Sequence, residues 1–293
     1  MLSDFASRPA FETIRPRRQT APFIFNSAHS GADYPERFLR LTRLDTLSIR
    51  QSEDSFVDEI FEQAPFLGAP LLRAHFPRAY LDVNREPYEL DPLMFSEPLP
   101  ISFNTTSQRV AAGLGTVARI VAENKAIYRQ KLTLEDAQMR IQGIYKPYHK
   151  TLQELLSETL QKFGVAILID CHSMPPLAKT ANTPSPDIVL GDRFGTTCAP
   201  ALTSLADEIF SNAGYVVARN QPYAGGYITQ SYGQPQHNIH ALQIEFSRPL
   251  YMNESTRRPH KGFDQIKQIT TTLIAQLHHM NLNLLNNHEI AAE

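Results

Sequence analysis

The sequence predicts an α/β fold with a mostly parallel, doubly wound central sheet and helices on both of its faces. Short apolar runs typical of buried strands alternate with longer segments whose apolar residues recur at helical spacing. Several of these runs end in polar side chains, as strands of such sheets do where they meet functional loops. We expect one α/β domain over residues 21–293, after an irregular N-terminal arm over residues 1–20.

The first strand is expected over residues 22–28, a short apolar run that ends immediately before His29. A helix should begin at Ser52, whose hydroxyl can cap the amides that follow. Glu53 and Asp54 suit the positively polarised first turn of this helix. The pattern therefore predicts both carboxylates near a helix start.

Two more strand candidates follow over residues 70–76 and 79–83, and Pro87 ends regular structure behind them. Residues 116–161 show a mostly helical pattern with a break near Thr133. This long segment is expected to supply the helices that cross between strands.

The second half of the chain alternates strands and helices more regularly. Residues 164–169 form a buried strand that runs into Asp170 and His172. The other elements expected there are strands over 187–190, 215–219 and 239–246, helices over 200–212 and 262–277, and a loop over 222–227.

Composition and charge limit the class of protein. A hydrophobic share of 42% and a charged share of 20% are those of a globular chain with a large core, which excludes a disordered or fibrous protein. The net charge of −2 provides no cationic field for nucleic acid or an anionic membrane, so a small molecule is the expected partner. Two cysteines without a CxxC pair favour a reducing, cytoplasmic location. Homo-oligomerisation is left open.

Polar side chains gather where the predicted strands end, and a core would not tolerate them unpaired. Asp170 and His172 lie two residues apart and share one face of their strand, while Cys171 points to the other face. Gln243 and Glu245 likewise share a face. The full set at strand ends is His29, Asp82, Asn84, Arg85, Asp170, His172, Gln243 and Glu245.

Two histidines and a carboxylate at converging strand ends match the needs of a catalytic zinc site, which has three protein ligands and one open position. His29 and His172 are the candidate histidines. The third ligand is Asp54 or Glu53, which sequence spacing leaves as alternatives. Each residue also has a structural interpretation, since acidic side chains in a first helical turn are ordinary capping groups. Glu245, between Ile244 and Phe246, is the hardest to explain without a function.

Eight segments in order resemble the N-formylglutamate amidohydrolase family, from about Phe25 to Gly262, except for residues 92–132. They are HSGADYP at 29–35, EDSFVDEIF at 53–61, RAYLDVNREP at 78–87, YKPYH at 145–149, ILIDCHSMP at 167–175, IVLGDRFGTTC at 188–198, YAGGYITQSYGQP at 223–235 and HALQIEF at 240–246. This family is related to zinc carboxypeptidases and aspartoacylases. The resemblance implies a phosphorylase/hydrolase-like fold of the zinc carboxypeptidase type, with a mixed, mostly parallel sheet and one Zn²⁺.

The resemblance also assigns roles to residues. It implies His29, Asp54 and His172 as metal ligands, with Glu53 as the alternative carboxylate, and Glu245 as general base. It implies that Asn84 and Arg85 hold a substrate carboxylate. Further substrate-binding candidates are Arg78, Gln243, Gly225 and Gly226, and Asp170 and Asp82 are expected to support the ligands.

The implied activity is hydrolysis of N-formyl-L-glutamate to formate and L-glutamate in histidine degradation. Two alternatives stay open at this point. One is hydrolysis of another N-acyl amino acid or small peptide by the same metal site. The other is a catalytically silent protein of the same fold that binds a dicarboxylate.

Overall fold

The computed structural model describes residues 5, 8–121, 125–177 and 185–285. Contacts within the chain divide it into two compact units. Unit 1 comprises Met1–Glu12, Ala28–Ser55 and Arg73–Gln153, and unit 2 comprises Thr13–Ser27, Phe56–Leu72 and Glu154–Glu293. That residues 21–293 form one domain stays a prediction.

The main sheet is mixed and mostly parallel, which confirms the predicted fold class. Its strands within the described residues follow the order β1-β3-β2-β4-β7-β5-β6. Strand β4 pairs in parallel with β2 and β7, while β5 is antiparallel to β7 and parallel to β6. The strands are β1 (Phe11–Ile14), β2 (Phe23–Ser27), β3 (Leu71–Ala74), β4 (Ala166–Met174), β5 (Ile188–Gly191), β6 (Val217–Arg219) and β7 (Ile239–Ser247), and a small separate ribbon is formed by β8 (Met252–Asn253) and β9 (Arg258–Pro259).

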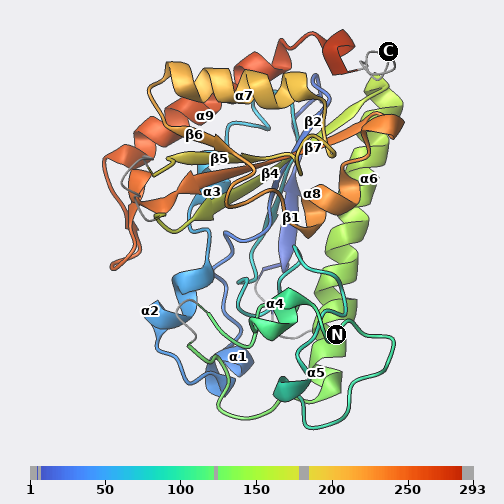
Figure 1. The fold of residues 1–293 in the computed structure, drawn as a ribbon, viewed down its shortest axis with the longest axis vertical. Helices are drawn as coiled ribbons and strands as arrows, with labels where there is room; N and C mark the ends of the chain where they lie inside the picture. Colours follow the sequence, from blue (N-terminus) through green and yellow to red (C-terminus); the bar gives the residue numbers. More distant parts are fainter. Residues whose placement is uncertain (1–4, 6–7, 122–124, 178–184, 286–293) are drawn as a thin grey trace. The chain divides into compact units, whose positions relative to one another are not determined.

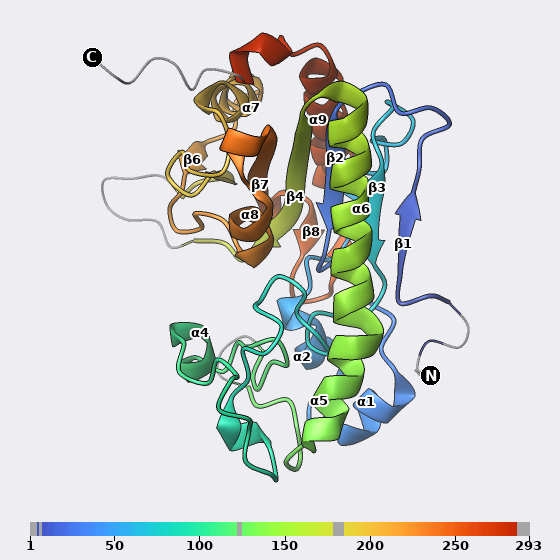
Figure 2. The ribbon, with the colours of Figure 1, turned by 90° about the vertical axis from the view of Figure 1, so that its right-hand side faces the viewer.

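Helices of unit 2 pack on both faces of its strands. Helices α7 and α9 lie against each other over one face (Figure 1). Helix α8 contacts β7 and β4 (Figure 2). Its Thr229 hydroxyl lies 3.4 Å from Asp170, which points to the face opposite the apolar core. The helices of the chain are α1 (Glu36–Leu41), α2 (Thr46–Ile49), α3 (Val57–Ile60), α4 (Gln108–Ala111), α5 (Leu134–Arg140), α6 (Lys146–Phe163), α7 (Pro200–Asn212), α8 (Tyr227–Tyr232) and α9 (Gly262–His278), with a π-helical turn over Ile141–Tyr145 and short 3-10 turns over Arg50–Ser52, Pro92–Met94, Pro235–His237, Arg248–Leu250 and Leu282–Leu285.

The core of unit 2 forms on one face of the sheet, because successive strand residues point to opposite sides. Alternate residues of β2, β4 and β7 pack there against α3, α7 and α9. Ring centroids lie 5.7 Å apart for Phe25 and Phe61 and for Phe210 and Phe246. The residues from the three strands are Phe23, Phe25, Ile167, Ile169, Cys171, Leu242, Ile244 and Phe246.

Two expected elements near the candidate site differ in the structure. Residues 79–83 are not a strand, because Tyr80 and Leu81 donate to Pro77 in a turn. The helix expected from Ser52 begins at Val57, since Phe56 has a left-handed backbone with φ 68° that no continuous right-handed helix accommodates. Glu53, which has an extended backbone, and Asp54 therefore precede the helix rather than forming its first turn.

Other differences concern helix limits and the N-terminal arm. The helical segment expected from residue 116 begins at Leu134, where the Thr133 hydroxyl accepts the Asp136 N–H, while isolated bridges occupy part of the stretch before it. The loop expected over 222–227 ends where α8 begins at Tyr227. The described part of the arm contains strand β1 at the sheet edge. No helix in the described ranges combines the length and the apolar character that crossing a bilayer requires.

Candidate metal and hydrolase site

His29 lies two residues after the end of β2, at the start of the loop that follows the strand. Its carbonyl accepts the backbone N–H of Asp54 at 3.0 Å, which holds the two residues side by side. The Nδ1 atom of His29 lies 3.5 Å from Oδ2 of Asp54. Asp54 precedes α3 rather than belonging to it, so its N–H can pair with the carbonyl of His29 instead of a helical carbonyl.

His172 occupies β4, on the face opposite the apolar core of unit 2. Its register partner on the neighbouring parallel strand β7 is Glu245. Residues paired in this way point to the same side of a sheet, so Glu245 stands next to His172. Two residues earlier, Asp170 is paired with Gln243 in the same manner. Asp170 and His172 thus share one face of β4, and Gln243 and Glu245 share one face of β7, as predicted.

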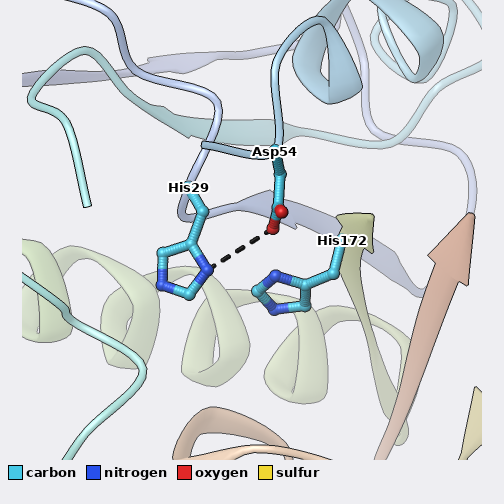
Figure 3. A group of neighbouring side chains, drawn as sticks. All are labelled: His29, Asp54 and His172. Atoms are coloured by element: carbon cyan, nitrogen blue, oxygen red, sulfur yellow. Dashed lines mark ion pairs between the residues drawn. The ribbon is translucent and has the colours of Figure 1, made fainter. Parts of the chain in front are cut away.

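His29, Asp54 and His172 come together as a buried group. Each contributes one ligand atom, and these atoms lie within 4.8 Å of one another. Their side chains are almost fully enclosed, with exposed fractions of 1%, 1% and 2%. Figure 3 shows both imidazoles turned toward the Asp54 carboxylate. Two imidazole nitrogens and one carboxylate oxygen are the donor set of many catalytic zinc sites, so the residues present fit such an ion.

Asp82 fixes the orientation of His29. Its Oδ1 lies 2.8 Å from Nε2 of His29, which directs Nδ1 toward Asp54. Burial alone would raise the pKa of Asp82, but the charges of Arg78, Arg85 and His29 outweigh it and hold that pKa well below its usual value. A carboxylate behind a ligating imidazole is a recurring arrangement in metal sites.

Asp170 stands in the same relation to His172. Its Oδ2 lies 3.1 Å from Nε2 of His172 and 3.4 Å from the Thr229 hydroxyl. Its Oδ1 accepts a hydrogen bond of 2.8 Å from the Asn26 amide. This buried carboxylate is therefore hydrogen-bonded from two sides, which offsets the cost of removing it from water.

Glu53, the alternative carboxylate, is engaged elsewhere. It accepts hydrogen bonds from the Tyr34 hydroxyl at 2.6 Å, from Arg50 Nε at 2.9 Å and from the Ser55 hydroxyl at 2.8 Å. It is absent from the ligand group found among the described residues. Its partners already satisfy a charged carboxylate, which favours Asp54 as the third ligand.

Arg85 and Arg78 both approach Asp82. Arg78 Nε lies 2.9 Å and Arg85 Nε lies 3.7 Å from Oδ2 of Asp82, and the Asn84 backbone N–H donates to Oδ1 at 2.8 Å. Arg85 also donates to the carbonyls of Asn84 and Leu114. Burial lowers the pKa of Arg85 to about 10, against the attraction of Asp82, so its guanidinium is charged at neutral pH.

Gln243 links the general-base candidate to the glycine pair. Its amide nitrogen donates to Oε1 of Glu245 at 2.9 Å, and its oxygen accepts the Gly226 N–H at 2.7 Å. Gly225 has φ +121°, and a Cβ there would approach Thr229 to 3.0 Å. A side chain at this position would be strained by the positive φ and crowded by Thr229.

Some supporting residues were not singled out from the sequence. Asn26, Tyr34 and Arg50 each hold a carboxylate of the candidate set. For Asn26 the sequence contains a signal, because an amide at an inward position of an apolar strand needs a partner. Tyr34 and Arg50 carry no comparable signal, since tertiary contacts alone define their roles.

Comparison with known proteins identifies relatives of this chain. The family model for N-formylglutamate amidohydrolase matches residues 21–252. N-formylglutamate deformylases of Pseudomonas aeruginosa and Pseudomonas putida are 26% and 28% identical to the chain, covering 91% and 87% of it and 94% and 90% of their own lengths.

Solved structures agree with this result. The crystal structure of an N-formylglutamate amidohydrolase from Ralstonia eutropha superposes with a TM-score of 0.87 at 36% identity, covering 92% of this chain and 97% of its own. A gene product of Agrobacterium tumefaciens, 17% identical, shares the fold with a TM-score of 0.67 over 93% of this chain and 96% of its own. The chain therefore belongs to the N-formylglutamate amidohydrolase family.

Proposed function

We propose that this protein hydrolyses the amide bond of N-formyl-L-glutamate, releasing formate and L-glutamate. The observation that carries the proposal is the buried His29, Asp54 and His172 group in a chain of this family. Water adds its oxygen to the formyl carbon, and the bond from that carbon to the glutamate nitrogen breaks.

His29, Asp54 and His172 would hold a single Zn²⁺ ion. A zinc ion bound by three protein ligands polarises a carbonyl oxygen and lowers the pKa of its bound water to about 7. Asp82 and Asp170 support this role, because a carboxylate oxygen of each lies within hydrogen-bonding distance of Nε2 of one of the two imidazoles. They hold the rings in position and increase their basicity.

Glu245 is the proposed general base. Its register position beside His172 supports this role, as does its hydrogen bond from Gln243, which holds one carboxylate oxygen in place. The carboxylate accepts the proton that the attacking water loses. It then delivers that proton to the departing amine of glutamate, so that the net reaction consumes one water.

Arg85, with Asn84 beside it, is the proposed reader of a substrate carboxylate. Asp82 carries one negative charge between the two guanidinium groups of Arg78 and Arg85, so a positive charge remains for a substrate anion. A planar guanidinium can bind a carboxylate through two parallel hydrogen bonds, which fixes the scissile bond relative to the base. Arg78 is the candidate for the second carboxylate, and Gly225–Gly226 for a loop that closes over substrate.

Two broader assignments accompany this proposal. N-formylglutamate as substrate would place the reaction in histidine degradation. Cys171 and Cys198 are both free thiols in the structure, which supports a reducing location such as the cytoplasm.

Formate release by the purified protein tests the function. The protein as isolated, after treatment with a chelator and after addition of one equivalent of zinc would be assayed with N-formyl-L-glutamate, N-acetyl-L-glutamate and N-formylglycine. We expect activity that is lost with the metal, regained with zinc and highest for N-formyl-L-glutamate. Preference for another member of the panel would favour a different N-acyl amino acid hydrolase. Binding of glutamate without any turnover would indicate a silent dicarboxylate-binding protein.

A further inference from the structure

The segment Arg78–Arg85 carries the groups that surround Asp82 without belonging to a helix or strand. Its backbone follows turns, with Tyr80 donating to Pro77 and Asp82 donating to Thr116. Arg85 orients its guanidinium by donating to the backbone carbonyls of Asn84 and Leu114. The position of this side chain therefore depends on how firmly the surrounding backbone is held.

Three side chains from one helical stretch hold carbonyls of this segment. Arg140 donates to the Tyr80 carbonyl at 2.9 Å. Tyr145 donates its hydroxyl proton to the Arg85 carbonyl at 2.7 Å. His149 Nε2 lies 2.9 Å from the Val83 carbonyl, and since a carbonyl only accepts, the imidazole is the donor. All three side chains are buried.

The π-helical turn over Ile141–Tyr145 explains how these three side chains reach one segment. In a regular α-helix, residues five apart point about 140° away from each other, so Arg140 and Tyr145 would occupy different faces. One extra residue in a π turn removes about 100° of this difference and leaves about 40°. Tyr145 and His149, four apart, already share a face, and their rings stack with centroids 4.2 Å apart.

We propose that Arg140, Tyr145 and His149 are positioning residues that hold Arg85 in the orientation for reading a substrate carboxylate. This inference rests on the proposed function. The π turn over Ile141–Tyr145, an irregularity inside the helical stretch, aligns the three donors on the loop. Tyr145 makes the most direct contact of the three, since its hydroxyl donates to the carbonyl of Arg85 itself.

The Tyr145→Phe variant tests this proposal, because it removes the donating hydroxyl and keeps the ring that stacks on His149. We expect KM for N-formyl-L-glutamate to rise about 3- to 10-fold, the range for one lost hydrogen bond, while kcat stays near the parental value. The Kd of the product L-glutamate, measured by calorimetry, should rise by a similar factor. Zinc content should be unchanged.

Tyr148→Phe provides the matched control. Tyr148 lies in the same helix and is fully buried, and its ring, which phenylalanine keeps, packs edge-on against Phe11, Phe76 and His149. A loss of stability without a change in KM is expected for this variant. His149→Gln, which keeps a donor, should preserve KM better than His149→Leu.

Two outcomes would overturn the positioning role. One is a Tyr145→Phe variant with parental KM and parental Kd for L-glutamate, whatever its melting temperature. The other is an equal rise of KM in Tyr148→Phe, which would indicate a general effect of helix packing. A parent protein that hydrolyses no N-formyl-L-glutamate would instead refute the proposed function, so the two failures are distinguishable.

Discussion

The two faces of strands β2, β4 and β7 differ sharply although they belong to the same three strands. One face presents aromatic and aliphatic side chains to α3, α7 and α9. The other face presents a row of polar groups, with Asn26, Asp170 and Gln243 aligned in register across the strands. His172 and Glu245 form the next pair of that row.

Within one sheet, the apolar face therefore mainly stabilises the fold, and the polar face carries the candidate catalytic groups. The apolar face gains free energy of folding by removing carbon surface from water. Its polar counterpart is buried almost as deeply, and it is tolerated because the groups satisfy each other, as in Asn26 with Asp170 and Gln243 with Glu245. Substitutions on the two faces should therefore have effects of different kinds.

Replacing His172 by Ala on the polar face should have the largest effect on activity. The variant removes one of the three proposed ligands, so we expect metal to be lost and kcat/KM to fall by at least about 10³-fold. His240→Ala is the matched control, because His240 lies on the opposite face of β7 and accepts the Ala199 N–H. The control should lose stability and keep its metal. Elemental analysis showing a full equivalent of zinc in His172→Ala would place the metal elsewhere.

Glu245→Gln should lower kcat by about 10²- to 10⁴-fold while zinc remains bound. Glutamine keeps the shape of the side chain and can still accept the hydrogen bond from Gln243, but it cannot take up the water proton. Metal content, melting temperature and kcat measured on one preparation distinguish three roles for this residue. A ligand would lose metal, a structural residue would lose stability, and near-parental kcat in a folded, metal-loaded variant would exclude the general base.

Phe210→Ala tests the apolar face, where the ring packs against Phe246. Truncating a fully buried phenylalanine should lower the free energy of unfolding by about 3–5 kcal/mol. Activity per folded molecule should stay near the parental value, because the polar face is unaltered. Denaturant titration combined with kcat below the unfolding transition measures both quantities. A large fall in kcat of the folded variant would mean that the two faces are not independent.

The smallest expected effect is on the alkylation of the two cysteine thiols. Burial raises the pKa of Cys171 well above its usual value and that of Cys198 to about 12. Because the thiolate is the reactive form, neither cysteine should be alkylated in the native protein at pH 8, and both should react after unfolding. Cys171 lies between Asp170 and His172 in sequence but points to the apolar face. If mass spectrometry detected rapid alkylation of Cys171 in the native protein, the apolar face would be accessible to solvent.

The part of the site that lies on strands was predictable from the sequence. Alternation along β4 and β7 places Asp170 with His172, and Gln243 with Glu245, on common faces, because side-chain direction in a strand is a local property. Helix α7 was likewise predicted with its observed limits, since its apolar spacing and Pro200 are local signals.

The remainder depends on tertiary contacts that leave little local signal. Asp54 lies outside the helix because its N–H pairs with the His29 carbonyl, and the left-handed backbone of Phe56 delays the start of α3 to Val57. Residues 79–83 resemble a strand in composition, yet the Asp82 N–H donates to the Thr116 carbonyl in a loop. The π turn that supports this loop has no sequence signature. Such features become visible only when the contacts are known.

A crystal structure of the zinc-loaded protein, with anomalous diffraction measured at the zinc edge, tests the proposed metal site most directly. We predict one strong peak about 2.0–2.2 Å from a nitrogen of His29, a nitrogen of His172 and a carboxylate oxygen of Asp54. A peak coordinated by Glu53 in place of Asp54, or a single peak away from both histidines, would contradict this prediction.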